Sequence, residues 1–371
     1  MKGNEDTCST SLSVIKTTIM NKRSKIPKPF LPMFDSGDIP FPICETALLA
    51  HRSSGNKEEL VHYSKHNWDL IGSLGKTPTV CIHGLNGSRL LFSDLIRVVE
   101  VHYSHQIPLL VIDLFGHGLS ACPNRPYTLS LFVDQLESLL TYLQLSSNTS
   151  SKKINIIGFS LGGAIAVGFA AKHPDLIEKL CLIAPAGFVP FKNTSGNNSE
   201  DVERGGGISP NVKYVKWIPS FLLALLMRTM FKSAFSRPQP QLPENVPSFI
   251  QEEHRKQTER LIWQSFVKKG TFDATISIVK KFPLFNMEKE FKAVSATRVG
   301  RETPVLLIWG TQDRVIPMNT CAPKIKSFFR NSYLFKVDDA GHVVLNEQPT
   351  VVISAILSFL QSPPDFEFSD I

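Results

Sequence analysis

From about residue 44 onward, short apolar runs alternate with amphipathic stretches, a pattern that few folds accommodate. The apolar runs do not alternate with polar residues, as strands with one face in water would. Strands that are apolar on both faces are typical of a parallel sheet covered by helices on both sides, so the pattern predicts an α/β fold. The clearest predicted strands are residues 79–83, 109–114, 154–159, 180–184 and 305–309.

Amphipathic stretches with helical spacing lie between several of these runs. Two earlier segments, residues 45–51 and 59–65, are interpreted as an antiparallel pair that opens the sheet. Pro174 ends the last of the three clearest helical stretches, because proline cannot continue a helix. The predicted helices are residues 88–100, 129–143 and 161–173.

The alternation stops between residues 187 and 301 and then resumes. An insertion between two strands of one sheet is expected to form a helical cap over the carboxyl edge, where ligands bind in open α/β sheets. The sequence thus predicts a disordered tail at 1–43, a core at 44–186 and 302–371, and a cap at 187–301. Within the cap, residues 193–207 are rich in Gly, Asn and Ser and predict a loop. Residues 217–231 are very apolar and are interpreted either as a buried helix or as an acyl-chain groove or membrane-docking face.

Composition excludes several classes of protein. The chain is 42% hydrophobic, which excludes wholesale disorder, and no run reaches the ~18 apolar residues of a spanning helix. Its net charge of +7 is spread along the chain without a nucleic-acid motif, so no nucleic-acid partner is expected. The six cysteines form no CxxC pair, and no secretory signal is seen. These features favour a reducing, cytoplasmic location, with peripheral contact between the cap and a membrane left open.

A candidate nucleophile lies between a predicted strand and a predicted helix. Residues 158–162 read Gly-Phe-Ser-Leu-Gly, which matches G-x-S-x-G. A nucleophilic serine at such a site occupies a strained strand-to-helix turn, and Gly158 and Gly162 would let the helix approach the strand. The sequence therefore predicts Ser160 as a nucleophile rather than an ordinary helix-capping serine.

A serine nucleophile needs a base and a carboxylate that orients the base. Asp313 and His342 each follow a predicted strand, which places both at the carboxyl edge of the sheet. Asp338 and Asp339 are alternative acids, but they are closer to His342 along the chain and are expected to cap its loop. His83 is an alternative base at the end of an earlier strand, where histidines are generally structural.

The developing oxyanion needs hydrogen-bond donors. The backbone N–H groups of Leu85 and Leu161 are the candidates. Leu85 comes just after the predicted strand 79–83, and Leu161 directly follows Ser160. Gly84 would let the backbone approach a substrate closely. No metal site and no organic cofactor are implied by these residues.

From about residue 44 to 361 the chain resembles an α/β-hydrolase with an inserted cap, and is most similar to monoacylglycerol-lipase-like and esterase members. The resemblance rests on HGLNGS at 83–88, DLFGHGLS at 113–120, GFSLGG at 158–163, LCLIAPAGF at 180–188, WGTQDRVIP at 309–317 and GHVVLNEQP at 341–349. It implies a mostly parallel eight-stranded sheet flanked by helices and the catalytic order Ser160, Asp313, His342. It also implies that Asp113 and His117 shape a loop beside the site and are structural.

The predicted function is a serine hydrolase of carboxylic esters with lipophilic acyl chains. A serine at the nucleophile position argues against epoxide hydrolases and haloalkane dehalogenases, which place Asp there. Three alternatives remain: hydrolysis of a C–C bond in a diketone, acyl transfer to an alcohol or lysophospholipid, and a hydrolase-fold binding protein without activity. The partner is a small-molecule ester or lipid; the oligomeric state is not predicted.

Overall fold

The computed structural model describes residues 20, 26–28, 39–42, 44–50, 58–147, 150–190, 214, 217–235 and 248–363. Most of the predicted tail at 1–43 and all of the predicted loop at 193–207 lie outside these residues. Among the described cysteines, Cys44, Cys81, Cys122, Cys181 and Cys321 are free thiols.

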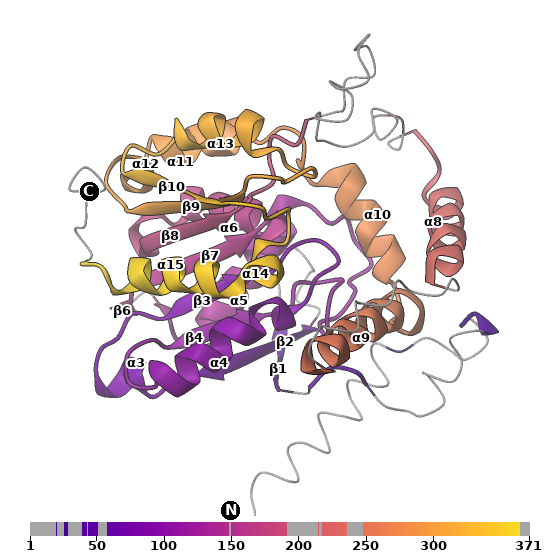
Figure 1. Cartoon of the computed structure of the whole chain (residues 1–371), viewed down its shortest axis with the longest axis horizontal. Coiled ribbons are helices and arrows are strands. Elements are labelled where there is room, and N and C mark those ends of the chain that lie inside the picture. The colour runs from indigo at the N-terminus through magenta and orange to yellow at the C-terminus, as the bar shows by residue number, and fades with distance from the viewer. Residues whose placement is uncertain are drawn as a thin grey trace, which may run out of the picture.

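An eight-stranded sheet forms the centre of the molecule (Figure 1). Its strands are β1 (Glu45–Ala50), β2 (Glu58–His66), β3 (Thr79–Ile82), β4 (Leu109–Ile112), β7 (Ile154–Phe159), β8 (Ile177–Ile183), β9 (Val305–Gly310) and β10 (Ser332–Val337). They lie in the order β1-β2-β4-β3-β7-β8-β9-β10, in which β2 runs antiparallel to both β1 and β4 and the other neighbours are parallel. The predicted antiparallel opening pair and the mostly parallel eight-stranded sheet are therefore confirmed. A separate small ribbon pairs β5 (Ser146–Ser147) with β6 (Ser150–Ser151).

Helices cover both faces of this sheet. One face carries α4 (Ser93–His102) and α15 (Pro349–Gln361), and the other carries α5 (Leu129–Tyr142) and α6 (Leu161–Lys172) (Figure 1). Along β3, Val80 and Ile82 belong to the core beneath α5 and α6, whereas Cys81 between them belongs to the core beneath α4 and α15. Successive side chains of a strand point to opposite faces, so a strand buried on both sides must be apolar throughout.

The remaining helical elements lie mainly around the carboxyl ends of the strands and in the predicted cap. They are α3 (Leu70–Ser73), η4 (Arg89–Phe92), η5 (Pro174–Leu176), α8 (Ser220–Phe235), α9 (Ser248–Ile262), the π-helix η7 (Trp263–Val267), α10 (Thr271–Lys281), α11 (Glu288–Ser295), α12 (Arg298–Arg301), α13 (Met318–Lys326) and α14 (Val344–Glu347).

The predicted cap contains two kinds of helix. α8, α9 and α10 lie beyond the end of the sheet (Figure 1), whereas α11 packs against α6 and against α12. Phe291 and Val294 of α11 are fully buried in the same core as α6. The predicted boundary at residue 301 stays a prediction, and the packing favours assigning α11 and α12 to the core that surrounds the sheet.

Candidate active site

Ser160 occupies the sharp turn between β7 and α6. Its backbone has φ 52° and ψ −114°, in the left-handed half of φ space that a non-glycine residue rarely adopts. Such strain persists only where the surroundings hold it, and here the Ser160 N–H donates to the Ile183 carbonyl at 2.9 Å. The side chain makes no capping hydrogen bond to α6. The helix-cap interpretation of Ser160 therefore fails, and its hydroxyl is available for another partner.

Two glycines let α6 pack closely on the sheet, and this close packing permits the turn at Ser160. A Cβ at Gly162 would lie 2.2 Å from the Ile82 carbonyl oxygen, and one at Gly158 would lie 2.6 Å from the Gly162 carbonyl oxygen. No side chain fits at either distance, so the approach of helix to strand requires glycine at both positions.

The structure brings the three candidate catalytic side chains together in one hydrogen-bonded chain. His342 Nε2 lies 3.1 Å from Ser160 Oγ, and His342 Nδ1 lies 2.8 Å from Asp313 Oδ2. The other carboxylate oxygen, Asp313 Oδ1, accepts from the N–H groups of Val315 and Ile316, each at 2.8 Å. The Asp313 side chain is fully buried, whereas 15% of the His342 side chain is exposed. The His342 imidazole is thus held from the protein interior by Asp313 and is partly exposed on its other side.

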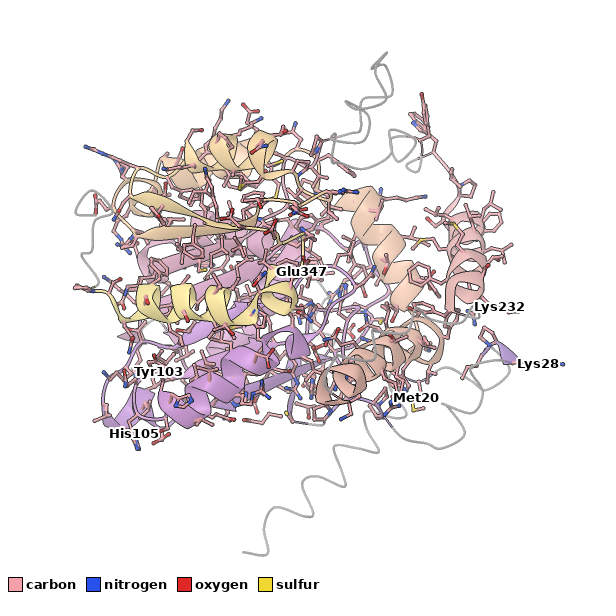
Figure 2. All side chains as sticks on the ribbon, viewed as in Figure 1. Met20, Lys28, Tyr103, His105, Lys232 and Glu347 are labelled. Atoms are coloured by element: carbon pink, nitrogen blue, oxygen red, sulfur yellow. The ribbon has the colours of Figure 1, made fainter. Side chains whose placement is uncertain are left out.

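The alternative acids lie elsewhere. Asp338 and Asp339 are both exposed, and Asp339 Oδ1 accepts from Gln312 Nε2 at 2.9 Å. One carboxylate beside His342 was not predicted from the sequence: that of Glu347 on α14 (Figure 2). Its Oε2 accepts from the Gly341 N–H at 2.5 Å and its Oε1 from the Val343 N–H at 3.0 Å. Glu347 therefore fixes the backbone on both sides of His342, which positions the imidazole.

The two candidate oxyanion donors flank Ser160. Leu161 is the first residue of α6, where N–H groups have no partner within the helix. Leu85 follows Gly84, at which a Cβ would lie 3.1 Å from the Ser160 Cβ, so the loop after β3 runs directly beside Ser160. Across the described part of the chain, neither the Leu85 N–H nor the Leu161 N–H donates to a protein acceptor. Both amides are therefore free to receive an oxyanion.

His83 is not positioned to act as a base on Ser160. Its Nε2 accepts from the Leu114 N–H at 3.0 Å, so Nδ1 carries the proton and donates it to the Gly84 carbonyl at 2.8 Å. Burial lowers the pKa of this imidazole, which keeps the ring neutral. The Gly84 carbonyl belongs to the same peptide group as the Leu85 N–H. His83 therefore orients a candidate oxyanion donor instead of taking a proton.

Asp113 and His117 are both fully buried. The Asp113 carboxylate accepts from His62 Nδ1 at 2.7 Å, from the Arg89 N–H at 2.7 Å and from the Leu119 N–H at 2.9 Å. Burial by itself would raise the pKa of Asp113, but the hydrogen bond and charge of His62 hold it far below the usual range. Burial lowers the pKa of His117 to about 3. These contacts support the predicted structural roles of Asp113 and His117.

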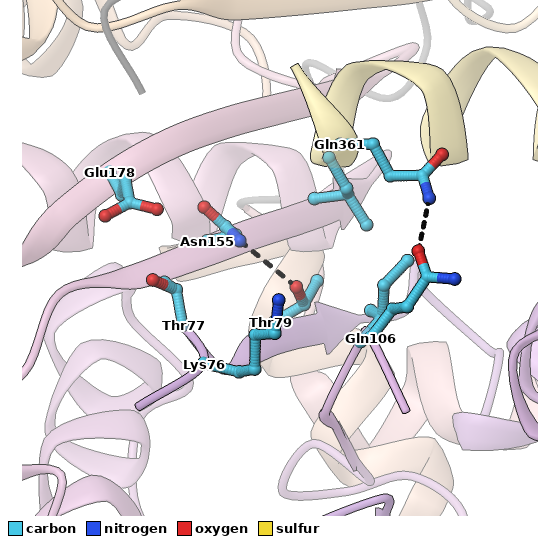
Figure 3. A pocket seen from close by; sticks show the side chains of 9 residues that line it. Lys76, Thr77, Thr79, Gln106, Asn155, Glu178 and Gln361 are labelled. Atoms are coloured by element: carbon cyan, nitrogen blue, oxygen red, sulfur yellow. Dashed lines mark hydrogen bonds between the residues drawn. The ribbon is translucent and has the colours of Figure 1, made fainter. Parts of the chain in front are cut away.

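A polar cavity of about 320 Å³ lies at the opposite edge of the sheet (Figure 3). Asn155, the second residue of β7, donates to Thr79 Oγ1 at 3.3 Å, while Gln361 donates to Gln106 across the cavity at 2.7 Å. Ser160 follows the other end of β7, so this cavity is separate from the candidate site. Among the described residues, no three His, Cys, Asp or Glu side chains are grouped so that they could hold a metal ion.

Comparisons with known proteins show which family and which proteins the chain is similar to. Residues 77–349 match a family described as "alpha/beta hydrolase fold". The chain is 27% identical over 277 residues to Lipase 1 of Psychrobacter immobilis, covering 74% of each chain. It is 20% identical over 315 residues to monoacylglycerol lipase ABHD6 of Homo sapiens, covering 84% of each. A thermophilic esterase from Thermogutta terrifontis superposes with a TM-score of 0.56 at 18% identity, over 86% of this chain and 98% of the esterase.

Proposed function

Because the chain belongs to the alpha/beta hydrolase fold family, we propose that it hydrolyses carboxylic esters with Ser160 as nucleophile, His342 as base and Asp313 as orienting acid. Similarity to proteins named lipase supports its assignment as a carboxylic ester hydrolase. The observation that carries the residue roles is the unbroken chain of contacts from Ser160 Oγ through His342 to the buried Asp313 carboxylate.

The reaction divides into acylation and deacylation. His342 Nε2 takes the proton of Ser160 Oγ as that oxygen forms a bond to the ester carbonyl carbon. The tetrahedral intermediate collapses when the bond to the leaving alkoxide breaks and His342 returns its proton to that oxygen. His342 then takes a proton from water as the water oxygen bonds to the acyl carbon. The second tetrahedral intermediate collapses when its bond to Ser160 Oγ breaks and His342 returns the proton to that oxygen, which releases the carboxylic acid and restores Ser160. Asp313 stabilises the imidazolium in both halves, and the amides of Leu85 and Leu161 stabilise each oxyanion.

The proposed substrates carry lipophilic acyl chains. To test this, the purified protein is treated with a fluorophosphonate probe and assayed on p-nitrophenyl esters from acetate to laurate. Each methylene buried in an apolar groove contributes about 0.8 kcal/mol, so we expect kcat/KM to rise about fourfold per methylene until the groove is full. Equal kcat/KM across the series would contradict the acyl preference. A folded wild type that the probe does not label would contradict the serine mechanism, and product ester in place of free acid would indicate acyl transfer.

The predicted cap also presents an apolar surface to the outside. Helix α8 packs Leu223 inward and sets the ring of Phe231 edge-on to Phe272 of α10, with ring centroids 5.5 Å apart. Much of the remaining helix surface is exposed: Trp217, just before the helix, is 85% exposed, and Phe221, which also lines a cavity shared with α10, is 77% exposed. The other exposed apolar residues are Leu222, Leu225, Leu226 and Met230. We call these six side chains the α8 apolar surface; a patch of this kind marks an interaction site.

We propose that the α8 apolar surface contacts a bilayer that contains anionic lipid. The helix carries Arg228 and Lys232 and no acidic residue, and Lys232 lies at the outer edge of the molecule (Figure 2). Apolar side chains beside basic ones are the features of helices that lie in a membrane interface. In the described part of the chain, no helix is long and apolar enough to cross a membrane. Contact between α8 and the bilayer surface would bring the proposed active site close to lipid esters.

Vesicle sedimentation tests the α8 apolar surface. We expect Phe221→Ser with Leu225→Ser to weaken binding to phosphatidylcholine vesicles containing phosphatidylserine by about 10- to 100-fold, because two large apolar side chains lose their burial. Lys232→Gln should weaken it by about fivefold, an effect that salt reduces. The control is Leu74→Ser with Val101→Ser, which replaces two exposed apolar residues away from α8. Unchanged vesicle binding by the α8 variants, or a shift only in oligomeric state, would contradict a lipid partner.

A further inference from the structure

The loop that carries the Leu85 N–H is a tight turn. The Gly87 N–H donates to the Gly84 carbonyl at 3.1 Å, and Asn86 has φ 58°. Asn tolerates a positive φ at the third position of such a turn, but the turn alone does not hold the residue in this conformation. The Gly84 carbonyl and the Leu85 N–H belong to one peptide group and point in opposite directions. Any rotation of this turn therefore swings the Leu85 N–H away from the oxyanion.

Two side chains from the predicted cap hold Asn86. Gln264 Nε2 donates to the Asn86 carbonyl at 3.3 Å, and Thr275 Oγ1 donates to Asn86 Oδ1 at 3.2 Å. The other end of the Gln264 amide, Oε1, accepts from the Gly118 N–H at 2.6 Å. Gln264 thus joins the loop after β3 to the loop after β4. Gln264 is 2% exposed; its contact to Gly118 is buried, and its contact to Asn86 is partly buried.

A π-helix places Gln264 at this position. The π-helix η7 lies directly after α9, and all residues from Trp263 to Lys268 are buried. An ordinary amphipathic helix cannot bury six consecutive side chains, whereas single π-turns recur at functional sites. Lys268, at the end of this segment, donates from Nζ to the His117 carbonyl at 2.7 Å. The segment thereby makes polar contacts with residues 117 and 118 as well as with Asn86.

We propose that Gln264 is a positioning residue through which the predicted cap holds the Leu85 amide in its oxyanion-binding orientation. The inference rests on the proposed function, because it assigns a role within that oxyanion site. From the core, His83 holds the same peptide group by its carbonyl. From the cap, Gln264 and Thr275 hold the next residue. The oxyanion site is thereby complete only when the predicted cap is in place.

Gln264→Met tests this role, because it keeps the length of the side chain and removes both hydrogen bonds. We expect kcat to fall about 10- to 100-fold, as for a displaced oxyanion donor, with KM within about twofold. Inhibition by phenylboronic acid, which forms a tetrahedral anion on the serine, should weaken in parallel with kcat. Thr275→Val removes only the second contact to Asn86 and should lower kcat about fivefold. Ser265→Ala is the control, because Ser265 lies in the same π-helix and is equally buried.

The outcomes separate the two proposals. Unchanged kcat and boronate inhibition in folded Gln264→Met, with only a lower melting temperature, would show a purely structural role and overturn the inference. If Gln264→Met does not fold, unchanged kcat and boronate inhibition in Thr275→Val would overturn it. A wild type that neither hydrolyses esters nor reacts with a fluorophosphonate would overturn the proposed function, and the inference with it. Parallel losses of kcat and boronate affinity, absent in Ser265→Ala, would support both.

Discussion

Ser160→Ala is expected to lower kcat for ester hydrolysis by about 10⁶-fold, the loss found when the nucleophile of a serine triad is removed. The reason is that no other oxygen can replace the Ser160 hydroxyl, which lies 3.1 Å from His342 Nε2. Residual hydrolysis would come from the oxyanion donors and from substrate binding alone. Initial rates on a p-nitrophenyl ester and covalent labelling by a fluorophosphonate measure the loss.

The same variant should fold normally. The Ser160 side chain makes no capping hydrogen bond to α6, and alanine meets the same backbone requirement at φ 52° as serine. The melting temperature should therefore change little. Ser354→Ala, an exposed serine on α15, is the control and should keep wild-type rates and labelling. Labelling that persists in Ser160→Ala would show that another residue is the nucleophile.

The elements of the sheet and the grouping of the three candidate catalytic side chains could be predicted because their signals are local. The segments around Ser160 and Asp313 each combine a buried strand with the turn residues that follow it, whereas His342 follows β10, which is only partly buried. In a parallel sheet, such strand ends meet at one edge, so the topology itself gathers the three side chains. Boundaries differ slightly: the strand predicted at 180–184 is observed as Ile177–Ile183, and the helix predicted to begin at 88 starts with a 3₁₀ turn at Arg89.

The positioning residues could not be predicted in this way, because they act across long sequence separations. Gln264 meets Gly118 from 146 residues away and Asn86 from 178 residues away, and nothing near Gln264 in the sequence signals these contacts. Glu347 is only four residues from Val343, but its role depends on both carboxylate oxygens facing backbone N–H groups. The tautomer of His83 likewise depends on the Leu114 N–H, 31 residues away.

Helix α8 shows a limit of apolar periodicity. A sequence that is apolar all round the helix is consistent with a fully buried helix. It is equally consistent with a helix that is buried on one side and contacts a partner on the other. Both interpretations of residues 217–231 were therefore open from the sequence. In the structure, Leu223 and Phe231 face the neighbouring helix while Phe221 and Leu225 remain exposed. Fully buried packing is thus excluded for this helix within the described residues, and the interface reading is retained as a proposal.

Asp313→Asn is expected to lower kcat by about 10⁴-fold while leaving the geometry of the site intact. Two backbone N–H groups, those of Val315 and Ile316, point at Asp313 Oδ1. In the variant, the amide oxygen must take that position, because an NH₂ group there would face two donors. The amide NH₂ then faces His342 Nδ1 and can only donate to it. The imidazole proton moves to Nε2, which loses its ability to accept the proton of Ser160.

Asp339→Asn provides the matched control for this argument. Asp339 is exposed and accepts one hydrogen bond from Gln312, which an asparagine oxygen can also accept. Its kcat should stay within about twofold of wild type, since the interaction is at the surface. Because the loss in Asp313→Asn comes from the tautomer, fluorophosphonate labelling should slow in parallel with kcat while the melting temperature changes little. Wild-type kcat in Asp313→Asn, together with a large loss in Asp339→Asn, would move the acid to the loop before His342.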